Sequence, residues 1–134
     1  MIKGQLEARK KVSKFKKQSI HYFENALHFI EADDPEKASE FLWGSVSQAL
    51  KAVAASRGIE LRSHKQVRDY AMEIAKNLRD DSIRHEFNSA QSLHSNFYES
   101  GLMLEDVVIG AEDARRLVAK LFNLIPEEEA TNGD

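Results

Sequence analysis

The chain has 134 residues, a formal net charge of −3 and no cysteine. A chain of this length is expected to form one domain with its own apolar core. The absence of cysteine excludes disulfides and thiolate metal sites, and a cytoplasmic setting is the simplest expectation. No apolar run approaches the roughly 20 residues that a membrane-spanning helix needs, so we expect no segment in a membrane.

The first half of the chain predicts two long helices. Few glycines, two prolines and a sustained 3.6-residue periodicity are typical of an all-helical protein. The first helix is expected over about residues 4–32, with a broad apolar stripe and a cationic opposite side. Asp34 and Pro35 suit the start of a second helix, which should end near Arg57, with Gly58 directly after it.

Three further helices are expected in the second half. Ser63 and Gln66 have the spacing of a capping box, which predicts the start of the third helix. The fourth and fifth helices are expected over about residues 81–100 and 105–125.

The connections between these helices predict the architecture. The short links at 33–34 and 79–81 favour antiparallel neighbours, so we expect an all-α, five-helix up-and-down bundle that begins with a long helical hairpin. Residues 1–125 should form this single domain. Residues 126–134 are acidic and rich in turn-forming residues, and we expect a disordered tail there.

Several short motifs carry a family resemblance. The most specific is Leu-His-Ser-Asn-Phe-Tyr-Glu at residues 93–99; the others are Lys37-Ala38-Ser39-Glu40 with Leu42-Trp43, Gln48-Ala49-Leu50-Lys51-Ala52 and Ser63-His64. With them the chain resembles the HEPN domain superfamily, and more closely its archaeal PaREP branch, over roughly residues 15–123. The resemblance implies a helical bundle, commonly a homodimer. Relatives range from nucleotide-binding partners of nucleotidyltransferases to metal-independent RNA-cleaving toxins.

The resemblance also suggests catalytic candidates. Ribonuclease members carry an Arg, a polar residue and then a His, and the best match here runs from Arg79 to His85. In such an enzyme Arg79 would stabilise the phosphate charge, and His85 or His94 would act as acid or base. Where that motif would place an Arg before His94 the chain has Asn88, which carries no charge.

A second group of residues suggests a ligand site. His94 falls on the same helical stripe as Ile83 and Phe87, where an apolar side chain is expected. Together with Tyr98 one turn later it could line a pocket, or it could be a buried histidine paired with Tyr98. Further ligand candidates are Ser63 and His64 at a helix N-terminus, where capping is the structural alternative, and Asn96.

The cations of the first helix are candidates for nucleic-acid binding. Lys3, Lys10, Lys14 and Lys17 share one face, which could contact phosphates or simply be solvated. The histidines lack the spacing of a metal site, so we expect neither a metal nor a cofactor.

The leading hypothesis is a non-catalytic, homodimeric HEPN-like module that binds a nucleotide or a partner protein near the third and fourth helices. A metal-independent endoribonuclease of the toxin type is the first alternative. The second is a nucleic-acid-binding protein that uses the lysine face. A nucleotidyltransferase-type protein is a further expected partner.

Overall fold

The computed structural model describes residues 2–100 and 103–127, with side chains for 3–95 and 103–127. These residues form an all-α fold with no strand, as predicted. The helices are α1 (Ile2–Glu31), α2 (Pro35–Ser56), α3 (His64–Leu78), α4 (Asp81–Ser100) and α5 (Leu104–Asn123). None of the described helices combines the length and apolar character needed to cross a membrane. The predicted tail at 126–134 lies mostly outside the described residues.

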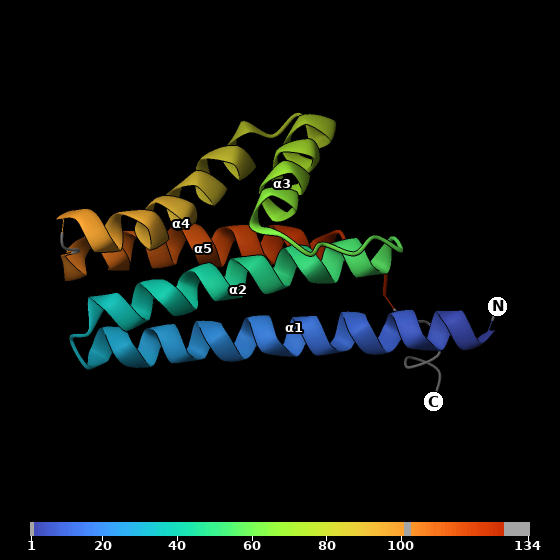
Figure 1. The fold of residues 1–134 in the computed structure, drawn as a ribbon, viewed down its shortest axis with the longest axis horizontal. Helices are drawn as coiled ribbons and strands as arrows, with labels where there is room; N and C mark the ends of the chain where they lie inside the picture. Colours follow the sequence, from blue (N-terminus) through green and yellow to red (C-terminus); the bar gives the residue numbers. More distant parts are fainter. Residues whose placement is uncertain (1, 101–102, 128–134) are drawn as a thin grey trace.

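The helices form two antiparallel hairpins with one helix added between them. Figure 1 shows α1 beside α2 and α4 beside α5, with α3 rising away from this four-helix core. The short link at 79–81 predicts that α3 and α4 lie side by side. Instead they form an open V, and α3 buries an apolar stripe that includes Val67 and Ile74 at the core.

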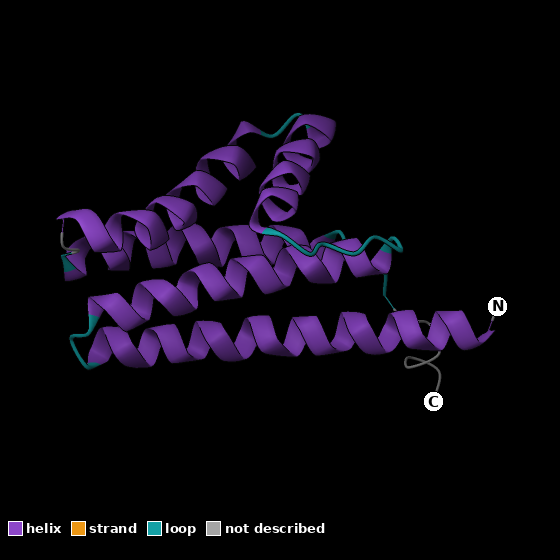
Figure 2. Ribbon diagram, viewed as in Figure 1, coloured by secondary structure: helices purple, strands orange, loops and turns teal. Residues whose placement is uncertain are grey.

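The segment between α2 and α3 sets where α3 begins. Figure 2 shows this loop running back alongside α2, so that α3 starts over the middle of α2 and not beyond its end. Gly58 allows the reversal with a φ of +73°, a conformation that favours glycine. The amides of Gly58 and Ile59 donate to the carbonyls of Ala55 and Ala54, which closes the end of α2.

The predicted N-terminal caps are confirmed. The Asp34 carboxylate accepts a hydrogen bond from the Lys37 amide at 3.1 Å, and Pro35 begins α2. Ser63 Oγ accepts from the Gln66 amide, and the Gln66 side chain accepts from the Ser63 amide, which completes a capping box. Local sequence therefore determines where these two helices begin.

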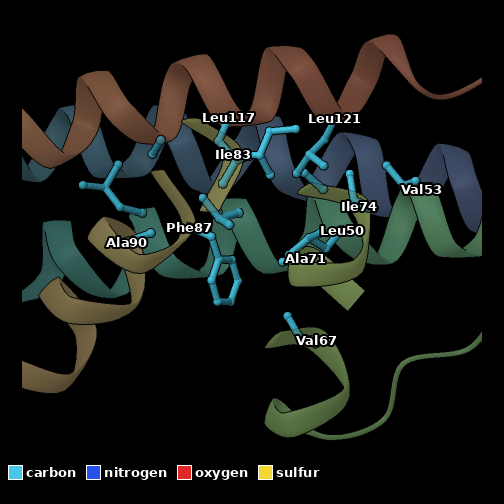
Figure 3. Close-up of a cluster of buried hydrophobic side chains, with 14 of the residues drawn as sticks. Leu50, Val53, Val67, Ala71, Ile74, Ile83, Phe87, Ala90, Leu117 and Leu121 are labelled. Carbon is cyan, nitrogen blue, oxygen red and sulfur yellow. The ribbon is translucent and has the colours of Figure 1, made fainter. Parts of the chain in front are cut away.

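The core is built around α2, which has eleven buried residues and is the most buried helix among the described residues. Figure 3 shows Leu50 and Val53 of α2 among side chains from α3, α4 and α5. Phe87 of α4 is fully buried and is among the largest of them. Burial of this apolar surface is the main stabilising term for a bundle of this size.

Two small residues set the contact between α1 and α2. Ser19 and Ser45 are fully buried, and each hydroxyl donates to the other residue's backbone carbonyl at 2.8 Å. Gly44 of α2 makes room for the ring of Tyr22 of α1, which lies 3.0 Å from where a Cβ would sit. An alanine at 44 would press against that ring.

A buried carboxylate joins α4 to α5. Glu86 is 4% exposed. Its Oε1 lies 3.0 Å from Lys120 Nζ, and its Oε2 lies 3.6 Å from Arg116 Nε. Lys120 Nζ also donates to Ser82 Oγ at 2.6 Å. The ion pair therefore compensates the cost of desolvating the carboxylate, because a buried charge needs both a partner and hydrogen bonds.

Lys120→Met should therefore destabilise the fold by about 2–4 kcal/mol, because it leaves the Glu86 carboxylate buried beside the more distant Arg116. Arg115→Met is the matched control on the same helix, since Arg115 pairs with the exposed Glu112. The control should cost less than about 1 kcal/mol. Urea unfolding measures both values, and equal losses would contradict the structural role of Glu86.

Candidate functional site

The candidate site centres on Trp43 of α2, the single tryptophan of the chain. The His64 ring centroid lies 5.0 Å from that of Trp43, tilted by 32°. The His94 centroid lies 5.7 Å away and is stacked within 20° of the indole plane. Two imidazoles from α3 and α4 thus contact one indole, and we name Trp43, His64 and His94 the Trp–His cluster.

The first turn of α3 positions His64. The returning loop brings Ser63 over α2, and the capping box fixes the backbone at this point. Gln91 Nε2 of α4 lies 3.3 Å from His64 Nε2, so the amide can donate to the ring when the imidazole proton is on Nδ1. His64 is exposed, and its ring is therefore held in place but open to solvent.

The apolar stripe of α4 positions His94. Ile83, Phe87 and Ala90 are buried as the stripe predicts, whereas His94 is only half-buried. Phe87 meets Trp43 edge to face at 5.5 Å, and His94 follows Phe87 two turns later on the same side. The expected structural partner of His94 was Tyr98, whose side chain lies outside the described ones.

The residue types of the cluster have the chemistry to contact a flat, negatively charged ligand. Imidazole nitrogens donate hydrogen bonds to phosphate or carboxylate oxygens, and an aromatic group provides a stacking surface. The N-terminus of α3 adds backbone amides and a favourable dipole next to His64. The Ser63 hydroxyl is already engaged by the Gln66 amide, so Ser63 acts as a cap here. The Asn96 side chain is not among those described.

Within one chain, the catalytic candidates do not lie close together. Arg79 follows the end of α3 and His85 lies near the start of α4; both are exposed. His94 is nine residues beyond His85 on α4, which places the two about 13 Å apart along the axis and on roughly opposite sides. The two histidines therefore cannot act together on one phosphate within a single chain.

The turn at Arg79 has a strained backbone. Arg79 adopts a φ of 52°, in the left-handed region that glycine prefers. The Asp80 amide donates to the Ala75 carbonyl, and the Asp80 carboxylate caps α4 by accepting from the Ser82 amide at 3.0 Å. The hydrogen bond from the Ser82 hydroxyl lowers the pKa of Asp80. The hydrogen bonds of the ionised Asp80 therefore stabilise the fold above the ordinary carboxyl pKa. This contribution is lost as the pH falls through the lowered pKa of Asp80.

Arg79→Gly should stabilise the fold by about 0.5–1 kcal/mol, because glycine adopts this conformation without the Cβ penalty. Lys76→Gly, three residues earlier within the helix, is the control and should cost about 1 kcal/mol. Thermal unfolding followed by circular dichroism compares the two. A loss of stability in Arg79→Gly would show that the guanidinium makes a stabilising contact.

The lysines proposed for nucleic-acid binding lie on the outer side of α1. All four, Lys3, Lys10, Lys14 and Lys17, are exposed. Lys10, Lys14 and Lys17 line a shallow groove with Ser13 and Gln18. Their exposure fits a solvated face as well as a contact with phosphates, so nucleic-acid binding stays a prediction. Within residues 3–95 and 103–127, no three acidic or histidine side chains gather as metal ligands do.

Sequence reasoning found only part of the site. His64 and His94 were ligand candidates, but no pattern linked Trp43 to either histidine. Gln91 was not singled out at all, since its hydrogen bond to His64 joins residues that are 27 positions apart. Phe87 and His94 lie seven residues apart on one helix face, which is a signal that the sequence carries.

The five helices and the Trp–His cluster define an all-α bundle protein with an aromatic, histidine-bearing surface. A model of the archaeal PaREP1/PaREP8 family matches residues 14–118. Since that match spans more than half of the sequence, the chain belongs to the archaeal PaREP1/PaREP8 family.

The fold is also similar to a solved structure. The crystal structure of a protein from Sulfolobus solfataricus superimposes with a TM-score of 0.70 and covers 81% of this chain and 97% of that one. The two sequences are 22% identical, so the likeness concerns the fold alone. A search of curated proteins found no significant match.

Proposed function

We propose that the protein is a non-catalytic, homodimeric binding module of the HEPN type that holds a nucleotide at the Trp–His cluster. The observation that carries the proposal is the meeting of His64 and His94 on the ring of Trp43. These residues come from three helices, and all three belong to motifs that resemble the HEPN superfamily. The fold brings the three side chains together.

The chemistry of the cluster favours a nucleotide over a purely apolar ligand. An indole flanked by imidazoles offers stacking to a base, and the same imidazoles donate to a phosphate. The α3 N-terminus lies beside His64 and favours negative charge. A nucleotide is the ligand class that uses the aromatic surface and the hydrogen-bond donors of the site together.

Binding fits this arrangement better than cleavage. In-line attack on RNA needs an acid and a base at one phosphate and a group that stabilises the developing charge. His85 and His94 face different sides of α4, and Arg79 belongs to the turn before that helix. An endoribonuclease site would therefore need residues from a second copy of the chain. A nucleotidyltransferase-type partner remains a further expectation of the HEPN resemblance.

Adenosine 5′-monophosphate should produce a saturable change in tryptophan fluorescence, because Trp43 is the single tryptophan and lies within the site. His64→Ala and His94→Ala should each weaken binding about tenfold, which corresponds to the loss of one charge-assisted hydrogen bond. His21→Ala is the control, since His21 is an exposed histidine of α1. A change that does not saturate, or equal affinity in all three variants, would contradict the proposal.

Cleavage is tested separately on the same proteins. A labelled single-stranded RNA should stay intact after incubation with the wild type. Cleavage that disappears in His85→Ala or in Arg79→Ala would instead establish the endoribonuclease reading. Cleavage that persists in both variants would point to a contaminating nuclease and would leave the binding proposal to the fluorescence titration.

A further inference from the structure

α1 carries a column of residues with a seven-residue period that is apolar at three of its four positions. Its members are Leu6, Ser13, Ile20 and Leu27. Leu6 is 49% exposed, Ile20 47% and Leu27 44%. Positions seven apart drift by only about 20° around a straight helix, so these side chains form one narrow stripe. A coiled coil has two apolar positions in each heptad, and this stripe offers one, so it is a narrow surface for pairing with a second helix.

A charged column runs beside this stripe in the same period. Its members, in chain order, are Lys3, Lys10, Lys17, Glu24 and Glu31. All five are exposed, and the sign of the charge changes once, near the middle of the helix. One half of the column is therefore complementary to the other half.

The charged column is turned away from α2. The apolar column lies between that outer side and the end of α5, because Ile20 is only about 100° from Ser19 and lines a groove with Phe122. α2 packs against the side of α1 that carries Ser19 and Ala26, both fully buried. On a helix Lys17 lies about 160° from Ser19, which is nearly the opposite side. Grooves flank the stripe: one contains Lys10 and Lys17, and the other lies between Ile20 and the end of α5 at Phe122.

We propose that α1 pairs antiparallel with α1 of a second copy of this chain. A two-fold axis beside Ile20 packs Ile20 against its own counterpart and places Leu27 over Ser13 of the second copy. The same axis brings Lys17 next to Glu24 and Lys10 next to Glu31 of the second copy. Each attractive pair occurs twice, as a two-fold interface requires.

The charges select this orientation. A parallel pair would bring the two lysine-rich halves together and the two acidic halves together, which is unfavourable. The antiparallel pair joins unlike charges along the whole overlap. This inference rests on the proposed homodimer and names the surface that forms it.

A nucleic acid is the competing occupant of this face. Nucleic-acid phosphates would pair with Lys10 and Lys17, but Glu24 and Glu31 in the same column would repel them. They would also leave Ile20 and Leu27 in water. A second copy of α1 accounts for both columns together, so we argue for self-association.

The size of the contact sets the expected affinity. The overlap from residue 10 to residue 31 is about 33 Å long, which is short for a protein interface. We therefore expect a concentration-dependent dimer with a dissociation constant on the order of micromolar.

Charge reversal tests the pairing by sedimentation velocity on the full chain. K10E/K17E and E24K/E31K should each weaken the dimer at least tenfold, because every pair along the column becomes repulsive. Mixing the two variants should restore a dimer of mixed composition, since all pairs are then attractive. Circular dichroism confirms folding, and Lys76→Glu on α3 is the control for a change of surface charge.

Three results would overturn the inference. If the wild type is a monomer at all accessible concentrations, the proposed homodimer is wrong. Nucleotide binding is judged separately, by the fluorescence titration. A dimer that persists in both charge variants keeps the homodimer but excludes α1 as its surface. A monomer that binds single-stranded RNA, with affinity lost in K10E/K17E and in high salt, assigns the face to nucleic acid.

Discussion

The rotation of α4 about its own axis is the constraint on which the candidate site depends. Glu86 and Leu93 lie seven residues apart on the side of α4 that faces α5. The first is held by Lys120, and the second packs where a Cβ on Gly110 would meet it at 2.2 Å. Phe87 follows Glu86, and His94 follows Leu93, so the same rotation of α4 turns Phe87 and His94 toward α2. Both meet Trp43. The ion pair of Glu86 therefore also fixes the direction in which His94 points.

The second histidine depends on the path of the chain between α2 and α3. Without the left-handed turn at Gly58 the chain would leave α2 in line with its axis, and α3 would begin far from Trp43. The returning loop and the capping box at Ser63 place His64 over α2 instead. The Trp–His cluster is therefore the product of two local features on different helices. This explains how an open V of α3 and α4 can still present a defined surface.

Local signals in the sequence predicted most of the fold. The caps at Asp34 and Ser63, the glycine at 58 and the helical periodicity lie within a few residues of the structure they determine. The V between α3 and α4 was missed because the length of a link does not fix the angle between helices. The burial of Glu86 was missed for a similar reason: its partner Lys120 is 34 residues away, and nothing near Glu86 in the sequence announces it. The site was predicted in part, since His64 and His94 were candidates, whereas no sequence pattern joined Trp43 to them and Gln91 was not singled out.

The chain belongs to the archaeal PaREP1/PaREP8 family, and the proposal that a nucleotide binds at the Trp–His cluster is the part that needs a test. The most direct test is nuclear magnetic resonance of the protein labelled at its indole and imidazole nitrogens, titrated with adenosine 5′-monophosphate. The account predicts saturable shifts of the Trp43 indole and of the His64 and His94 rings, with His21 and His28 unchanged. Shifts at His85 without a response from Trp43, or no saturable shift at all, would contradict it.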